Sequence, residues 1–255
     1  MPEHVWSVVG VLFAWWFSTG SILLMNGLNR ATFRISLGVV GAFGLVGVFG
    51  IWWSAPQTTT AAAWVGFGSA LSIWAWHELA FLTGLITGPN RSDCPPDVKG
   101  VARFKAATAT LIHHELAVFT TMLALVGLSW GEPNQTGSAI FVVLWIMRLS
   151  SKLNLFVGVR HVNTHFIPAH LRHLITYFGP QKLTPFLPLS IGMAVLGGAV
   201  GLPAFAAGSP AIAATLVGTL LALGILEHVF LALPLADAAL WRWALRSGHG
   251  APPTP

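Results

Sequence analysis

The chain has few charged residues and almost no cysteine. Charged side chains make up 8% of its 255 residues, against about a quarter in soluble globular proteins, and 55% of the residues are hydrophobic. The mean hydropathy is +0.72. This composition excludes a soluble globular domain and predicts a polytopic membrane protein. The single cysteine, Cys94, excludes a disulfide framework and any CxxC metal or redox centre.

Seven apolar segments have lengths near the roughly 20 residues that cross a hydrocarbon core of about 30 Å. They lie at approximately 5–28, 33–53, 61–87, 105–130, 137–158, 187–207 and 211–235. No segment shows the alternation expected of a strand, and no soluble domain can be separated. We therefore expect an all-α helical bundle with about seven transmembrane helices, which forms a single integral-membrane domain over residues 1–255.

Basic residues are distributed unevenly between the connections of these segments. Lys and Arg occur in the first, third and fifth connections and in the tail, and are absent from the second, fourth and sixth. Because basic loops stay cytoplasmic, this pattern predicts a periplasmic N-terminus and a cytoplasmic C-terminus. The net charge of +5 then reflects topology and contact with lipid headgroups, and nothing indicates nucleic acid. Two amphipathic segments, about 167–179 and 236–247, are expected at the cytoplasmic surface.

Three of the eight acidic residues lie beside histidine inside apolar segments. The strings are His77-Glu78, His113-His114-Glu115 and Glu227-His228, and a further apolar segment contains Arg148 and Lys152. A charged group at the centre of a membrane helix costs about 2.5–3.5 kcal/mol on insertion scales. We therefore expect the carboxylates to share one polar site with Arg148 and Lys152 as counter-ions, near the midplane and roughly 12–15 Å deep at 1.5 Å per residue.

Several roles for this site are consistent with its residue types. The cluster could fix helix packing as a buried polar network, or it could relay protons. It could ligate a pigment or haem through a neutral imidazole of His77, His113, His114 or His228. It could also hold non-haem iron or manganese through Glu78, Glu115, Glu227, His77, His114 and His228, although the Glu-x-x-His spacing of di-iron bundles is missing.

The fifth connection contains a second group of histidines. His161, His165, His170 and His173 are spaced loosely like the histidine boxes of membrane desaturases and hydroxylases. Spacings of this kind are common by chance. An amphipathic surface helix that begins after Pro168 explains the segment better.

Strings spread over nearly the whole chain resemble the PuhE family, whose members are labelled photosynthetic complex assembly protein 2. Among them are WWFSTG (15–20), WHE (76–78), CPP (94–96), HEL (114–116), WIMRLS (145–150), KLNLF (152–156) and EH (227–228). The resemblance implies a role in assembling the reaction centre and its light-harvesting antenna in the bacterial inner (intracytoplasmic) membrane, with subunits of that complex as partners. It supplies no catalytic or ligand residues.

Two functions therefore stay open. In the first, the protein is an assembly factor that handles bacteriochlorophyll at the His/Glu cluster. In the second, it is a membrane metalloenzyme with an iron or manganese site that modifies a pigment or quinone. Acid-rich helices favour a metal, whereas the absence of a recognisable cofactor fold or nucleophile pair favours the assembly factor.

Overall fold

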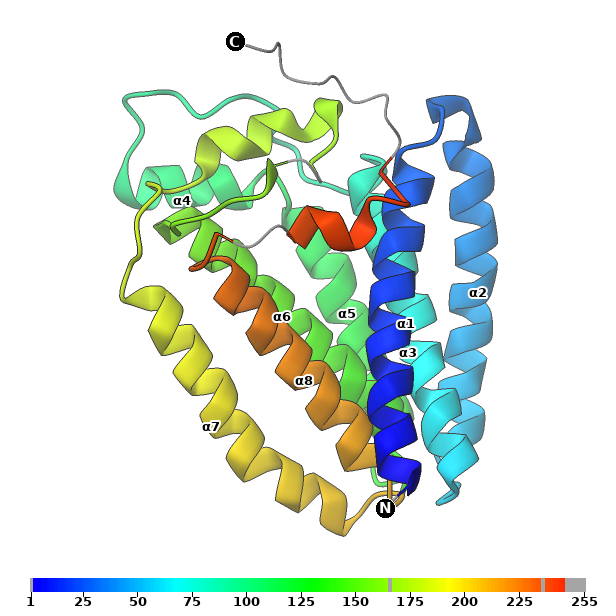
Figure 1. Ribbon diagram of the computed structural model, residues 1–255. Helices are drawn as coiled ribbons and strands as arrows, with labels where there is room; N and C mark the ends of the chain where they lie inside the picture. Colours follow the sequence, from blue (N-terminus) through cyan, green and yellow to red (C-terminus); the bar gives the residue numbers. More distant parts are fainter. Residues whose placement is uncertain (1, 165–166, 235–236, 246–255) are drawn as a thin grey trace.

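The computed structural model describes residues 2–164, 167–234 and 237–245, and this part of the chain is all-helical (Figure 1). The long helices are α1 (Pro2–Asn26), α2 (Phe33–Ser54), α3 (Thr60–Leu82), α5 (Ile112–Leu128), α6 (Thr136–Val157), α7 (Phe186–Ala207) and α8 (Ala213–Phe230). The short ones are η1 (Arg30–Thr32), α4 (Gly100–Thr108), η3 (Ala169–Tyr177) and η4 (Asp237–Trp241). The predicted all-α class is confirmed.

Five helical segments are long and apolar enough to cross a membrane. They are Pro2–Asn26, Arg30–Ser54, Thr136–Val157, Phe186–Ala207 and Ala213–Phe230, and α4 with α5 would make a sixth if this bent pair is one span. Helix α3 has 23 residues but is not in this group, because its Trp, Ser and Gly residues and the His77-Glu78 pair lower its hydropathy. The structure is thus that of a polytopic bundle, and the count of seven spans stays a prediction.

The segment expected as one helix over 105–130 is broken in the structure. Helices α4 and α5 meet at an angle of 66°, so the prediction of a continuous helix is wrong. The chain that follows α3 fills the break: the backbone N–H of Asn90 donates to Ala109 O at 3.0 Å, and that of His114 donates to Thr87 O at 3.0 Å. A side chain at Gly88 would collide with the backbone of the break. The backbone groups freed by the break therefore find partners in this loop.

Helix α3 lies in the middle of the bundle, where its small residues allow close packing. A Cβ atom on Gly47 or Gly50 of α2 would collide with Ser69 of α3, so both positions require glycine for this approach. On its other faces α3 joins a core that includes Phe67, Phe141 and Leu216 from three helices. These contacts determine which face of α3 is turned toward α6.

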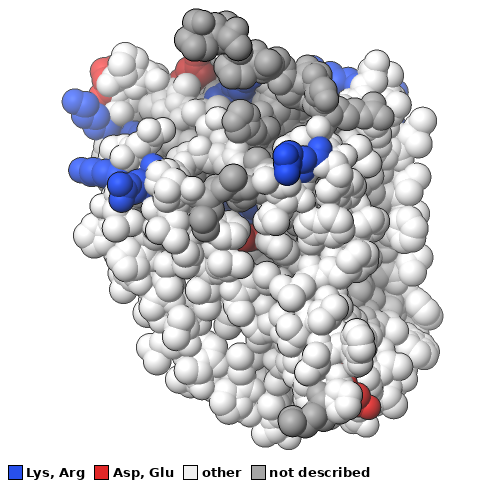
Figure 2. Space-filling view, viewed as in Figure 1, with Lys and Arg blue, Asp and Glu red and all other residues white. Residues whose placement is uncertain are grey.

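One end of the bundle is covered by α4, η3, η4 and the loops that join them, which we call the cap (Figure 1). Lys and Arg gather at the same end of the face shown in Figure 2. The expected segment 167–179 is a 3₁₀ helix in which Leu171 and Tyr177 are buried, so this apolar side packs on protein instead of lipid. Of the expected segment 236–247, residues 236, 246 and 247 lie outside the described part of the chain; the described residues contain η4, and Trp241 Nε1 donates to Trp16 O of α1 at 2.9 Å.

Candidate functional site: a cavity beside two ion pairs

Helix α6 presents two cations, one turn apart, to its neighbours. Arg148 and Lys152 are spaced i, i+4 and therefore lie on the same face of the helix. The guanidinium of Arg148 donates through Nη2 to Glu78 Oε2 of α3 at 2.8 Å. Lys152 Nζ donates to Glu115 Oε1 of α5 at 2.6 Å. The two ion pairs join α6 to α3 and to α5.

The two pairs differ in how far they are exposed. In the first, 6% of the Glu78 side chain is exposed, against 45% of Arg148. In the second, 15% of Glu115 and 20% of Lys152 are exposed. Arg148 lies between helices and keeps this accessible surface because it faces a cavity. The carboxylates are thus the inner partners, and the cations form the boundary with the cavity.

The third carboxylate, Glu227 of α8, faces the same cavity and forms no ion pair with another residue that the structure describes. Its Oε1 accepts a hydrogen bond from Trp15 Nε1 of α1 at 2.8 Å. Arg148 nevertheless interacts electrostatically with Glu227 as well as with Glu78 and Glu115. The three carboxylates therefore lie within electrostatic range of one guanidinium, although each contacts a different donor.

The three carboxylates lie nearer the ends of their helices than the lengths of the apolar segments predict. Glu115 is in the first turn of α5, Glu78 is close to the end of α3 at Leu82, and Glu227 is close to the end of α8 at Phe230. The expected depth assumed helices that continue to the ends of the apolar segments, whereas α3 and α8 end five residues earlier than those segments and α5 starts after the break. The groups sit just beneath the cap.

The four candidate imidazoles have different surroundings. His113 is exposed. His228 uses both ring nitrogens, with Gly224 O at 2.8 Å and Ser150 Oγ at 2.9 Å, and can act as a ligand only by losing one of these bonds. His77 contacts Thr121 Oγ1 through Nε2 at 3.0 Å, and the His114 ring lies 4.7 Å from that of Phe81. None of these four imidazoles lines the cavity beside the ion pairs.

Three buried polar atoms next to the ion pairs have no hydrogen-bond partner in the described part of the chain. They are His77 Nδ1, His114 Nδ1 and Glu78 Oε1. Buried polar atoms are usually paired, so an unsatisfied group of this kind marks a place for a water or a ligand atom. Across the described residues, however, no three His, Cys, Asp or Glu side chains are close enough together to hold a metal ion. The metal site predicted from three Glu and three His therefore stays a prediction, and the described residues offer it no ready-made ligand set.

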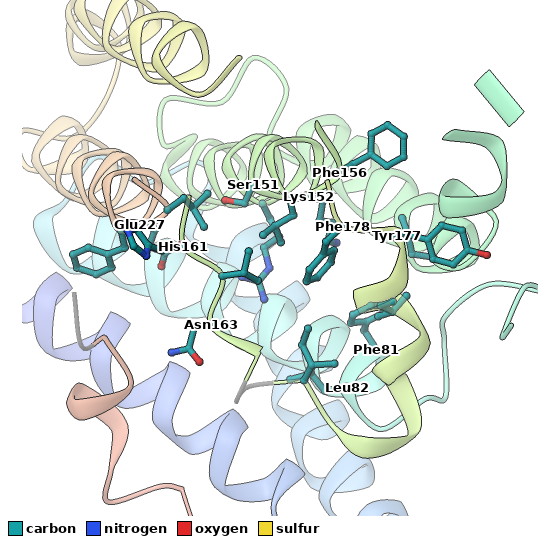
Figure 3. A pocket seen from close by; sticks show the side chains of 18 of the residues that line it. Phe81, Leu82, Ser151, Lys152, Phe156, His161, Asn163, Tyr177, Phe178 and Glu227 are labelled. Carbon is teal, nitrogen blue, oxygen red and sulfur yellow. The ribbon is translucent and has the colours of Figure 1, made fainter. Parts of the chain in front are cut away.

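A cavity of about 740 Å³ lies between the ion pairs and the cap (Figure 3). Its charged lining residues are Arg148, Lys152, Arg160 and Glu227. Aromatic rings form much of the remaining wall, from Phe81, Phe156, Tyr177, Phe178, Phe230 and Trp241. Ligand pockets commonly have about 300–1,000 Å³ and mostly apolar walls with a few polar groups. The cavity is therefore suited to a large amphiphilic molecule.

The cap is held over this cavity by hydrogen bonds to backbone carbonyls. Arg103 of α4 donates through Nη2 to Tyr177 O at 2.6 Å and stacks over the Phe156 ring at 4.3 Å. His170 of η3 donates through Nε2–H to Leu82 O at 2.9 Å. Burial lowers the pKa of His170 below its ordinary 6.5, and the positive charge of Arg30 adds to this effect. His170 is thus a neutral donor that ties the cap to the end of α3.

The histidines of the fifth connection do not form a desaturase-like site in the described residues. His161 lines the cavity, and its Nε2 is buried with no partner there. His170 is engaged with Leu82, and His165 lies outside the described residues. The cavity role of His161 and Arg160 could not be found from the sequence, because it depends on the path of the cap. The signal for the site in the sequence is the occurrence of charged residues in apolar segments, including Arg148 and Lys152 at i, i+4 spacing.

Comparison with known proteins finds a matching family and a similar protein. The family described as Protein of unknown function (DUF3623) matches residues 1–251. The chain is also 38% identical over 247 residues to the "Uncharacterized 30.4 kDa protein in puhA 5'region" of Rhodobacter capsulatus, a match that covers 92% of this chain and 89% of that protein. No solved structure matches the chain.

Proposed function

This chain belongs to the family described as Protein of unknown function (DUF3623), and we propose that it is an assembly factor for the bacterial photosynthetic reaction centre and its antenna. The observation that carries the proposal is the relative from the puhA 5' region of Rhodobacter capsulatus, which is consistent with a gene of a photosynthesis region. The strings shared with the PuhE family agree with this assignment.

The proposed activity is the transient holding of a bacteriochlorophyll-type pigment in the cavity. The aromatic wall offers edge and face contacts to a flat conjugated ring, and such contacts are worth about 0.5–1.5 kcal/mol each beyond the buried area. The position of the cavity beneath the cap, at the basic end of the bundle, suits a pigment that arrives from the cytoplasmic side of the inner membrane. His77 and His114 do not line the cavity, so we place the pigment against α6.

The alternative of a metalloenzyme has no comparable support. Iron or manganese sites need several carboxylate or imidazole ligands around one point. In the residues that the structure describes, Glu78 and Glu115 are instead engaged with Arg148 and Lys152. A pigment carrier requires no such ligand set, because the walls and the cations hold the molecule.

The test replaces the gene of the Rhodobacter capsulatus relative with the gene for this chain. Deletion of the relative should lower the amount of assembled reaction-centre and antenna complex, measured by near-infrared absorption of membranes and by native gels. This chain and the control Arg34→Gln, at an exposed site on α2, should restore the complex. The double variant Glu78→Gln/Arg148→Gln should insert at normal abundance and fail to restore it. Normal assembly in the deletion strain would refute the proposal.

A further inference from the structure

Most of the charged groups that face the cavity are cationic. Among the described residues, its lining contains three cations, Arg148, Lys152 and Arg160, and one carboxylate, Glu227. Glu78 and Glu115 compensate two of these cations from behind but are not part of the lining. The charges of these three cations and three carboxylates balance, but the groups that reach the cavity surface are mostly cationic donors on an otherwise mostly apolar wall. An anionic group of a bound molecule can accept hydrogen bonds from these donors at close range.

The cations have hydrogen-bond capacity that faces the cavity. A guanidinium carries five N–H donors, and Arg148 gives one of its nitrogens to Glu78. With 45% of its side chain accessible, the remaining donors of Arg148 can reach a carboxylate in the cavity. Lys152 lies one turn further along the same face of α6, so both cations can contact one acidic group. Charge-assisted bonds of this type are about twice as strong as neutral ones.

The apolar side of the cavity favours a flat body over a chain. Phe81 and Phe156 belong to α3 and α6, whereas Phe178 follows η3 in the cap, so rings approach from both the bundle and the cap. Figure 3 shows Phe81, Phe178 and Lys152 around the same space. The Lys152 ammonium lies 5.5 Å from the centroid of the Phe81 ring, which places charge and aromatic surface side by side. A conjugated ring with an acidic substituent matches both features.

We infer that the cavity binds a tetrapyrrole in its free-acid form, with the carboxylate on Arg148 and Lys152 and the ring between Phe81, Phe156 and Phe178. This inference rests on the proposed function, which it deepens by naming the chemical form of the pigment. The esterified pigment would lose the charge-assisted contacts and leave the cavity-facing donors of Arg148 without an anion. The protein would thus discriminate between a pigment acid and its ester.

The test uses two probes that differ in one carboxylate: pheophorbide a and its methyl ester. Each is titrated into the full chain in nanodiscs of zwitterionic lipid, with empty nanodiscs as the blank, and binding is followed by quenching of tryptophan fluorescence. We expect pheophorbide a to bind at least tenfold more tightly than the ester. In Glu78→Gln/Arg148→Gln the acid should bind as weakly as the ester, whereas the control Arg34→Gln should behave like the wild type.

A third probe, oleate, tests whether the acidic group alone is enough. We expect oleate to displace pheophorbide a poorly, because a flexible chain cannot stack against the aromatic walls. Equal binding of acid and ester, or displacement by oleate at the concentration of the acid, would overturn the inference. The first comparison needs only wild-type protein, so a variant that fails to fold does not obscure it. Equal and tight binding of acid and ester would leave the proposed function intact, which the gene replacement tests separately.

Discussion

We expect removal of Arg148 to lower the free energy of unfolding more than removal of its ion-pair partner Glu78 does. Arg148→Met leaves the Glu78 carboxylate 6% exposed and without its cation. Breaking a buried pair in this way costs about 3–5 kcal/mol. Glu78→Gln leaves Arg148 with 45% of its side chain accessible from the cavity, and the amide oxygen can still accept a hydrogen bond. We expect this change to cost about 1.5–3 kcal/mol, the value of a single hydrogen bond to a charged group.

The difference of about 2 kcal/mol corresponds to more than a tenfold change in the folding equilibrium. It can be measured by unfolding the purified protein in mixed micelles of dodecyl maltoside with increasing SDS, followed by circular dichroism. The double variant Glu78→Gln/Arg148→Gln removes both charges and should lie nearer the wild type than Arg148→Met does. Equal costs for the two single variants, or a larger cost for Glu78→Gln, would show that Arg148 does not face a hydrated cavity.

Two further predictions concern the borders of the cavity. Trp15→Phe removes the donor to Glu227 Oε1 and should lower the free energy of unfolding in the SDS assay by about 1 kcal/mol, whereas Trp53→Phe at an exposed site should change it little. Because burial lowers the pKa of His170, a detached cap takes up a proton near 6.5 before a docked cap does, so docking is lost as the pH falls below 6.5. Amide exchange in η3, corrected for intrinsic rates, should rise between pH 7.5 and 5.5, and His170→Gln should flatten this dependence.

The helical class of the chain could be predicted from the sequence, whereas the ends of the helices could not. Low charge and long apolar runs predict a bundle whatever the packing is. The loop at Gly88 fills the break between α4 and α5. This contact joins residues distant in the sequence, so hydropathy cannot predict it. Apolar segments also continue past the helices into the cap, as beyond Leu82, so Glu78 lies closer to the end of its helix than the apolar segment alone indicates.

For the site, the sequence indicated which residues are costly in a membrane but not which way they point. The cost of charged groups in apolar segments predicts that Arg148 and Lys152 lie with the three glutamates, and the structure pairs each cation with one of them. Helix rotation decides the rest. It turns His113 outward and places His228 between Gly224 and Ser150, although both share the His-Glu pattern with His77. A neighbouring His and Glu lie about 100° apart on a helix, so burial of one does not place the other in the same cavity.

The polar cluster can serve both helix packing and ligand binding. In each ion pair the carboxylate packs between helices, and the cation faces the cavity. The carboxylates of Glu78 and Glu115 lie behind α6 and hold the cations in one orientation. The cations present their accessible sides to the cavity, already ordered before any ligand arrives. Ordering a binding group in advance lowers the entropic cost of association. A site built in this way needs its buried acids for affinity even though they never touch the ligand, and variants of Glu115 should therefore weaken binding through Lys152.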